Sequence, residues 1–323
     1  MFLGRRVALA SAGAFVLAPG SASAQDFPRG PIRMVIAFPP GGPTDVVGRF
    51  MAHRMSELLG QQVVVENKPG ATGTIGTANV AQAKPDGQTI LFAASTMALV
   101  PALYGASLSY DAHKGLTAIA YVASMPLILV VLADGPKTTA ELIAQLHKDP
   151  GKYSYPSSGN GGLIHVAGYL FAKRAGAEVL HVPYRGSAPA MMDTIAGRHA
   201  FQMDTLGTSK GFIDSGKLRV LAVGASKRMP ALPDVPTVEE SAGFPFAVST
   251  WYVAFVPPGT PKPIIDKLNA AMNQAMTHPD MVARSKELAI DWVQSTPAEA
   301  QKFYDGQMAF WDPIVKESGA KAE

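Results

Sequence analysis

The feature that most constrains the fold is a regular alternation of strand-like and helix-like segments. Ile32 to Phe38 is a short apolar run typical of a strand, and Asp45 to Leu59 carries apolar residues at helical i, i+3, i+4 spacings. Strand-like runs follow at Val63 to Val65 and Thr89 to Ala93, with a helical segment at Thr77 to Ala83 between them. This order predicts an α/β fold with a mostly parallel sheet flanked by helices.

A second series of the same kind begins near Pro126 and runs to residue 223, and longer helical segments return from residue 263 onwards. These last helices have no sheet of their own, so we expect them to pack on the first unit. The sequence therefore predicts two α/β lobes, with a discontinuous lobe 1 (26–123 plus 229–323) and an inserted lobe 2 (124–228). Crossing strands would form a hinge, with the ligand between the lobes.

The first residues have the three-part layout of a secretory signal peptide. Arg5 and Arg6 precede an uncharged run from Val7 to Ala18, and Ala22-Ser23-Ala24 offers an A-x-A cleavage site. The lack of charge disfavours an amphipathic helix, and a membrane span needs about 20 apolar residues. We therefore expect a signal peptide over residues 1–24, cleavage after Ala24 and a periplasmic location, reached by the general or the twin-arginine route.

Charge and cysteine content narrow the function classes. Without residues 1–24 the chain has 26 Lys+Arg and 25 Asp+Glu, a net charge of +1. That balance predicts neither nucleic-acid binding nor a polybasic membrane surface, since both need a basic excess. The chain has no cysteine, hence no disulfide and no thiolate chemistry, and its 299 remaining residues are enough for a large core.

Sequence motifs for metal and nucleotide binding are missing. The seven histidines show no H-x-x-x-H or comparable metal spacing. The glycine-rich stretches match neither the G-x-x-x-x-G-K-[ST] phosphate loop nor the G-x-G-x-x-G dinucleotide loop. We therefore expect no metal, no cofactor and no enzymatic activity.

Two glycine-rich loops, each between a strand and a helix, are the main candidates for a binding site. Ligands of open α/β sheets bind at such positions, and the free N–H groups of a helix N-terminus suit an anion. The candidates in loop 1 are Phe38, Pro40, Gly41, Gly42, Thr44 and Asp45. The Asp45 charge would repel a carboxylate, so we expect it to accept N–H bonds of the loop. A plain proline–glycine turn is the alternative.

The candidates in loop 2 are Ser158, Gly159, Asn160, Gly161, Gly162 and His165. The helix dipole disfavours a cationic His165 in the first turn, so a neutral, hydrogen-bonding imidazole is expected. Contact with the ligand and bracing of the loop remain equally open roles for it. Two such loops, one in each lobe, would hold one ligand from opposite sides.

Further candidates follow other strands. Tyr184 and Arg185 precede a helix, and Arg185 would either pair with a carboxylate or form a surface salt bridge. Asp204 would either accept bonds from a ligand amine or hydroxyl or cap the next turn. Ser95 and Thr96 would likewise either contact the ligand or cap the next turn.

The chain resembles a known family, the Bug receptors, which are the extracytoplasmic binding subunits of tripartite tricarboxylate transporters. The resemblance covers nearly the whole mature chain. It rests on the stretches FPPGGPTD (38–45), VVVENKPG (63–70), GTIG (73–76), PDG (85–87), SSGNGGLIH (157–165), HVPYRG (181–186), GKLR (216–219), PDVPT (233–237) and PPGTP (257–261).

The resemblance implies a periplasmic receptor of the Venus flytrap type, whose glycine loops hold a ligand carboxylate through backbone amides and bridging waters. Its ligands would be di- or tricarboxylates, acidic amino acids or aromatic acids, delivered to membrane permease subunits, and we expect a monomer. Many members have serine or threonine where this chain has Gly162, which leaves room for a bulkier or less polar ligand. A receptor that signals to a sensor kinase and an α/β enzyme acting on carboxylates are the alternatives.

Overall fold

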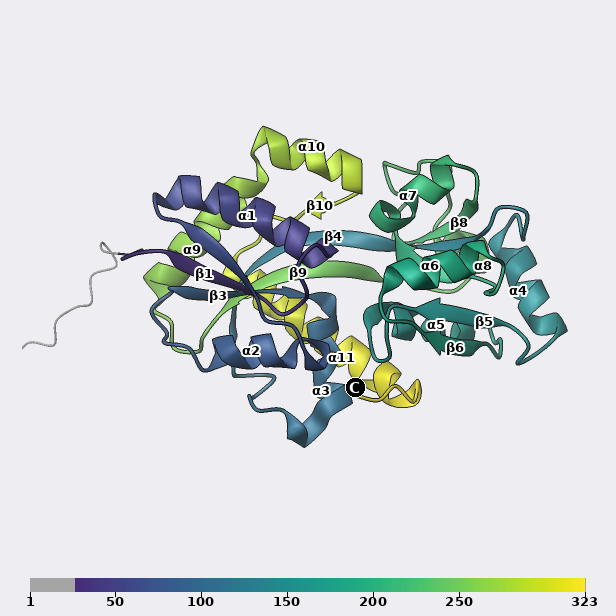
Figure 1. Cartoon of the computed structure of the whole chain (residues 1–323), viewed down its shortest axis with the longest axis horizontal. Coiled ribbons are helices and arrows are strands. Elements are labelled where there is room, and N and C mark those ends of the chain that lie inside the picture. Colours follow the sequence, from purple (N-terminus) through teal and green to yellow (C-terminus); the bar gives the residue numbers. More distant parts are fainter. Residues whose placement is uncertain (1–26, 323) are drawn as a thin grey trace, which may run out of the picture.

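The computed structural model describes residues 27–322, except for the side chains of residues 284 and 286–288. The predicted signal peptide, residues 1–24, therefore lies outside the described residues. The chain forms two α/β lobes side by side, with two long strands running from one to the other (Figure 1). No helix within the described part of the chain is long and apolar enough to cross a bilayer.

Lobe 1 is built from the N-terminal and C-terminal parts of the chain. Its elements are β1 (Ile32–Ile36), α1 (Pro43–Leu59), β2 (Val63–Asn67), η2 (Ala71–Gly73), α2 (Thr74–Ala81), β3 (Thr89–Ala94), η3 (Ser95–Ala98), α3 (Val100–Tyr104), η4 (Gly105–Ser107), α9 (Lys262–Met276), α10 (Pro279–Leu288), β10 (Asp291–Trp292) and α11 (Pro297–Glu317).

Lobe 2 is built from the middle of the chain. Its elements are α4 (Thr139–Lys148), β5 (Ser154–Ser157), α5 (Leu163–Arg174), β6 (Leu180–Pro183), α6 (Ser187–Ile195), β7 (Gln202–Thr205), α7 (Leu206–Asp214), β8 (Leu218–Gly224) and α8 (Val238–Ala242). Although the sequence predicted lobe 2 to end at residue 228, α8 packs on α4 and β8 of this lobe. The chain returns to lobe 1 only through the next strand.

The two crossing strands are β4 (Thr117–Leu132) and β9 (Ser249–Val256), as predicted for a hinge between lobes. The first part of β4 pairs antiparallel with β9, and its second part pairs antiparallel with β7 and β8. The pairs β1–β2, β1–β3 and β5–β6 are parallel. The parallel pairs thus lie within the lobes, and the antiparallel pairs involve the crossing strands.

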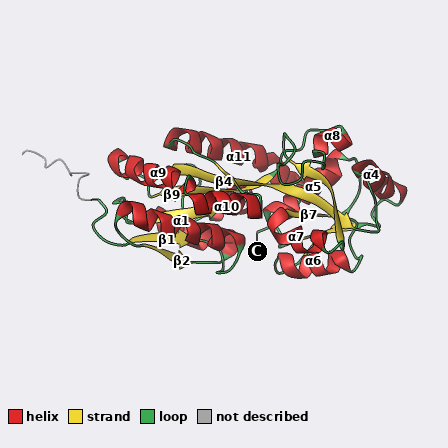
Figure 2. Cartoon of the chain, turned by 90° about the horizontal axis from the view of Figure 1, so that it is seen from above, coloured by secondary structure: helices red, strands yellow, loops and turns green. Residues whose placement is uncertain are grey.

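Alternating strand residues face two separate cores in lobe 1, with the sheet between layers of helices (Figure 2). Met34 and Ile36 of β1 pack with residues of α1 and α9, whereas Val35 packs on the other face with residues of α2 and α11. This second core continues into lobe 2 as far as Phe171 of α5. The lobes therefore share one apolar core along the crossing strands, which fixes the floor of the space between them.

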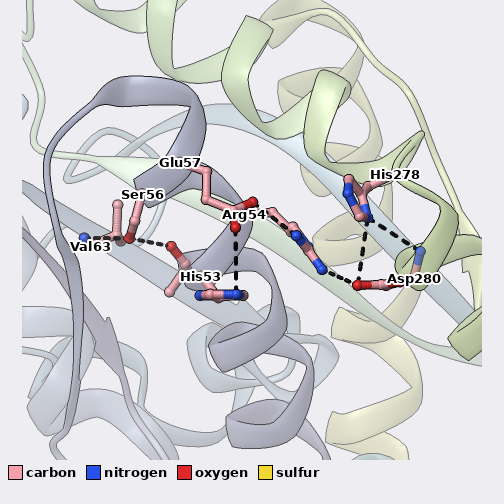
Figure 3. A network of polar contacts seen from close by, with 8 residues as sticks. His53, Arg54, Ser56, Glu57, Val63, His278 and Asp280 are labelled. Carbon is pink, nitrogen blue, oxygen red and sulfur yellow. Dashed lines mark hydrogen bonds and ion pairs between the residues drawn. The ribbon is translucent and has the colours of Figure 1, made fainter.

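A polar network holds α10 against α1 on the outside of lobe 1 (Figure 3). Arg54 of α1 bonds Glu57 of the same helix and Asp280 of α10, and the Asp280 N–H donates to the imidazole of His278. Exposed ion pairs such as these contribute little to stability. They link α1 to α10, two helices of lobe 1 that are far apart in the sequence.

Candidate functional site

A cavity of about 180 Å³ lies between the lobes, at the ends of β1, β3, β5 and β7. Residues of both lobes line it: Phe38, Pro43, Thr44, Ala94, Ser95, Thr96, Leu127, Ser158, Gly162, Leu163, Ile164, Ser187, Asp204, Thr205, Thr208, Thr250 and Tyr252. Among these lining residues Asp204 and Tyr252 can titrate, and none is an arginine, lysine or histidine. An anion in this cavity would therefore have to be held by neutral donors.

Loop 1 turns sharply between β1 and α1. Gly41 adopts φ +81°, a left-handed conformation that glycine reaches without strain, and Gly42 caps α1 in extended conformation. The Gly41 N–H donates to Asp45 Oδ2 over 2.9 Å. Asn67, at the end of the neighbouring strand β2, donates to the Phe38 carbonyl and to Asp45 Oδ1. The loop is therefore held in shape by a carboxylate in the first turn of its own helix.

Asp45 braces the loop and does not line the cavity, as the sequence argument about its charge predicted. Its carboxylate also accepts from Arg49 Nε over 2.9 Å. The bond from Arg49, with those from Gly41 and Asn67, lowers the pKa of the Asp45 carboxyl to about 2. Asp45 is therefore ionised at neutral pH, and the adjacent guanidinium offsets its charge in the first turn of α1.

Loop 2 repeats the conformation of loop 1 between β5 and α5. Gly161 has φ +72°, and Gly162 caps α5 with φ −74° and ψ 164°, against −78° and 169° at Gly42. The Gly161 N–H donates to His165 Nδ1 over 3.0 Å, again four residues along the chain. Of the two roles left open for His165, the structure shows the bracing of the loop.

His165 stacks on His181 of β6, with ring centroids 3.6 Å apart. Burial lowers the pKa of His165 to about 4 and that of His181 to about 3, where His165 adds a second, electrostatic cause. Burial therefore favours the neutral imidazole that the sequence predicted. His181 Nε2 lies 2.7 Å from Ser157 Oγ, which also bonds the backbone of Gly159, so the pair supports the whole loop.

The first residues of four helices line the cavity. Thr44 belongs to α1, Leu163 to α5 and Ser187 to α6, while Thr205 caps α7. The leading N–H groups of a helix have no partner within the helix, and its N-terminus carries a partial positive charge. Side-chain hydroxyls add further donors; those of Ser95, the first residue of η3, and Thr250 of β9 lie 3.1 Å apart. The arrangement suits a small anion.

Asp204 is buried beneath this ring of donors, with 1% of its surface exposed. Its Oδ1 accepts from the Thr205 N–H and the Thr208 hydroxyl, and its Oδ2 accepts from the Gln202 amide. Burial raises the pKa of Asp204 to about 6, although the three hydrogen bonds oppose the shift. A carboxyl thus lies inside a cavity otherwise made of hydrogen-bond donors.

Seven of the candidates predicted from the sequence line the cavity: Phe38, Thr44, Ser95, Thr96, Ser158, Gly162 and Asp204. The others lie outside that lining: Pro40, Gly41, Gly42, Asp45, Gly159, Asn160, Gly161, His165, Tyr184 and Arg185. The Tyr184 hydroxyl is used elsewhere in lobe 2, because it donates to Asp193 and lies 2.8 Å from His199. Arg185 is exposed.

Several lining residues were not among the candidates, notably Ser187, Thr205, Thr208, Thr250 and Tyr252. Ser187, Thr205 and Thr208 begin helices that follow strands, the same signal that identified the two glycine loops. Thr250 and Tyr252 belong to β9 and reach the site only through its pairing with β3. No local signal marks them.

Residues 207–211 read G-x-S-x-G, the pattern of a hydrolase nucleophile elbow. In such an elbow the serine is exposed on a sharp turn between strand and helix. Here Ser209 lies inside α7 and is fully buried, and its hydroxyl has no hydrogen-bond partner. The stretch is therefore an ordinary part of the helix and not a catalytic motif.

A larger cavity of about 510 Å³ lies near Pro126 of β4, between the segment after β8 and the residues before β10. Its lining includes two basic side chains, Lys227 and Arg228. Fewer helices and strands end at this cavity than at the smaller one. The smaller cavity is the better candidate because both lobes and four helix N-termini contribute to it.

The two lobes and the donor-lined cavity between them define a solute-binding protein. The chain belongs to the tripartite tricarboxylate transporter receptor family, whose model matches residues 47–320. It is 38% identical over 98% of its length to a protein encoded in the tcbD–tcbE intergenic region of Pseudomonas sp. strain P51, of which 95% is covered. It is 35% identical over 97% of its length to BugT of Bordetella pertussis, of which 98% is covered.

Solved structures of similar proteins share the whole fold. The periplasmic binding protein BugD matches with a TM-score of 0.79 and 35% identity, covering 91% of this chain and 99% of BugD. An adipate-bound protein of R. palustris matches with 0.82 and 29%, over 92% and 99% of the two chains. MatC of Rhodopseudomonas palustris, with bound malate, matches with 0.78 and 29%, over 90% and 100%. These matches confirm the predicted two-lobed fold and the family.

Proposed function

We propose that this protein captures a small organic carboxylate in the cavity between its lobes and delivers it to the permease subunits of a tripartite tricarboxylate-type transporter. The observation that carries the proposal is the cavity itself, where helix N-termini of both lobes and many hydroxyls meet without a basic side chain. Carboxylates are matched by such neutral donors. The malate and adipate bound to two similar proteins support the same ligand class.

Binding would work by a shift between open and closed lobes. Loop 1 and loop 2 belong to different lobes, so a ligand that bonds both favours the closed arrangement. Lobe 1 would comprise 26–123 and the C-terminal region, lobe 2 the inserted middle, and β4 and β9 the hinge. The protein would act as a monomer in the periplasm after cleavage behind Ala24.

A thermal-shift screen of the mature protein against small acids, with amines and sugars as controls, tests the proposal. An acid at 100 times its Kd adds about 2.7 kcal/mol to the free energy of unfolding. That gain raises the melting temperature by roughly 5 °C or more. No rise with any acid, using protein freed of bound ligand by unfolding and refolding, would contradict the proposal.

A matched pair of variants locates the site. Gly42 and Gly162 cap their helices with nearly the same backbone angles, and neither has a close neighbour where a Cβ would lie. Only Gly162 lines the cavity. We expect Gly162→Val to abolish the thermal shift and Gly42→Val to keep most of it, with similar melting temperatures when no acid is present. A thermal shift that survives in full in Gly162→Val would place the ligand elsewhere.

A further inference from the structure

Asp204 places a carboxyl group in a cavity whose other polar groups can donate hydrogen bonds to an anion. It lies with Thr205 and Thr208 on the lobe 2 side, opposite Thr44 and Ser95 of lobe 1. A ligand carboxylate held by the helix N-termini would share this small, buried space with it. Two carboxylates in one buried site cannot both be ionised unless a hydrogen-bond donor or a proton lies between them.

The hydrogen bonds of Asp204 leave room for one more donor. Its two oxygens accept from Thr205 N–H over 2.7 Å, from the Thr208 hydroxyl over 2.6 Å and from the Gln202 amide over 2.9 Å. An ionised carboxylate has about four acceptor positions, so roughly one remains for a group in the cavity. The Gln202 amide is itself held by the Thr194 hydroxyl, which fixes the carboxylate in place.

The elements around Asp204 supply it with no cation. On β4 its register partner is Ile128, which is apolar. The titratable groups on these elements have other partners. On α7 and α1 these are Lys210 with Asp214 and Arg49 with Asp45. On α5 and β5 they are His165 with Gly161, Lys173 with Glu317, Arg174 with the Pro245 carbonyl and Tyr155 with the His165 carbonyl. Around α6, β8 and β9 they are Asp193 with Tyr184 and Arg198, Arg219 with the carbonyls of Gly135 and Pro136, and Tyr252 with Thr44.

We propose that Asp204 selects the ligand by requiring a proton between itself and the bound acid. An acid with its own donor, such as a hydroxyl or ammonium group beside the carboxylate, supplies that proton and binds to ionised Asp204. An unsubstituted acid binds only when Asp204 takes a proton from solution. This inference rests on the proposed function and names its preferred substrates, the hydroxy and amino acids.

The two kinds of acid then differ in pH dependence. Binding that takes up one proton weakens about tenfold for each pH unit above the pKa of the group concerned. Because burial places the pKa of Asp204 near 6, an unsubstituted acid should bind roughly a hundredfold more weakly at pH 8 than at pH 5. Its hydroxy counterpart can bind to protonated Asp204 at pH 5 and to ionised Asp204 at pH 8, so its affinity should change by less than about threefold.

Isothermal titration calorimetry on the full mature protein tests this with matched pairs of probes: propionate and lactate, succinate and malate, glutarate and 2-hydroxyglutarate, phenylacetate and mandelate. Each titration is made at pH 5 and pH 8, in two buffers of different ionisation enthalpy, which counts protons taken up. For the pair that binds, we expect about one proton at pH 8 with the unsubstituted acid and none with the hydroxy acid.

Asp204→Asn removes the charge and keeps the shape of the side chain. We expect it to abolish proton uptake and to bring the two acids of a pair within about threefold of each other at pH 8. Asp193→Asn, a carboxyl of lobe 2 outside the cavity, is the control and should change neither. The uptake measurement on the unaltered protein stands even where Asp204→Asn folds poorly.

Two results would overturn the inference and leave the proposed function intact. One is an unsubstituted acid that binds at pH 8 as tightly as its hydroxy counterpart and without proton uptake. The other is an Asp204→Asn variant that folds and still discriminates between the two acids. If no acid of any pair binds the unaltered protein at either pH, the proposed function fails and this inference fails with it.

Discussion

Loop 1 and loop 2 share one backbone design but differ in the side chain that holds it. In each loop a glycine with positive φ donates its N–H to a side chain four residues on, and a second glycine caps the helix. The acceptor is the carboxylate of Asp45 in loop 1 and the imidazole of His165 in loop 2. Each loop is also fixed by a residue of the neighbouring parallel strand, Asn67 or His181.

The difference shows two ways to brace an anion site without adding net charge to it. Asp45 is ionised, and Arg49 one turn further along α1 offsets its charge. His165 needs no counter-ion because burial keeps it neutral. Both solutions leave the helix N-termini as the source of positive potential in the cavity.

Removing the brace of loop 1 should have the largest effect. Asp45→Ala leaves the Gly41 N–H and the Asn67 amide without their acceptor, and hydrogen bonds to a charged group contribute more to stability than neutral ones. We expect the free energy of unfolding to fall by about 3 kcal/mol in urea titrations. Asp45→Asn, which keeps an acceptor, should lose about 1 kcal/mol, because Arg49 is half exposed. Equal losses would show that charge, not the hydrogen bonds, holds the loop.

The braces of the two loops should lose their contributions to stability at different pH values. The pKa of His165 is lowered from 6.5 to about 4, so its contribution to stability is complete above pH 6.5 and is lost as pH falls towards 4. Asp45, whose pKa is lowered from 3.8 to about 2, loses its contribution only as pH falls from 3.8 towards 2.

Between pH 7 and pH 5 the difference in free energy of unfolding between the unaltered protein and His165→Gln should therefore shrink by about 2 kcal/mol. The corresponding difference for Asp45→Asn should stay constant. Asp204 has the opposite sign, since its raised pKa stabilises the fold below pH 3.8 and that contribution is lost as pH rises through about 6. Because Asp204 is present in the unaltered protein and in both variants, its contribution cancels in these differences. A constant difference for His165→Gln would show that the imidazole is not held neutral.

The two left-handed glycines should differ in their effect on ligand affinity. Alanine at either position strains the backbone by about 1 kcal/mol. At Gly161 the new Cβ would also lie 3.0 Å from Leu103 of α3, across the gap between the lobes, whereas Gly41 has open space. We expect Gly161→Ala to weaken binding of the best acid about tenfold and Gly41→Ala about twofold, by calorimetry. Leu103→Ala should restore much of the affinity of Gly161→Ala; no restoration would contradict this contact.

The smallest effect is expected at Arg185. Its side chain is exposed and does not line the cavity. Arg185→Ala should change the Kd for the best acid by less than about twofold and the melting temperature hardly at all. A tenfold loss would show that the ligand is held by a salt bridge and not by the two loops alone.

The sequence predicted the parts of this site that depend on local signals. Glycine pairs between strands and helices located both loops, and the charge of Asp45 indicated its bracing role. The sequence placed the start of the second series near Pro126 and missed the first part of β4, because that part is rich in alanine, which does not favour strands. The lining residues Thr250 and Tyr252 could not be found because only the pairing of β9 with β3 brings them to the cavity.

The most direct test of the two-loop account is a crystal structure of the protein with the acid that gives the largest thermal shift. The account predicts the acid in the cavity between the lobes, with a carboxylate oxygen within hydrogen-bond distance of backbone N–H groups at the start of both α1 and α5. A ligand bound instead in the larger cavity beside Lys227 and Arg228, or one that contacts a single loop, would contradict it.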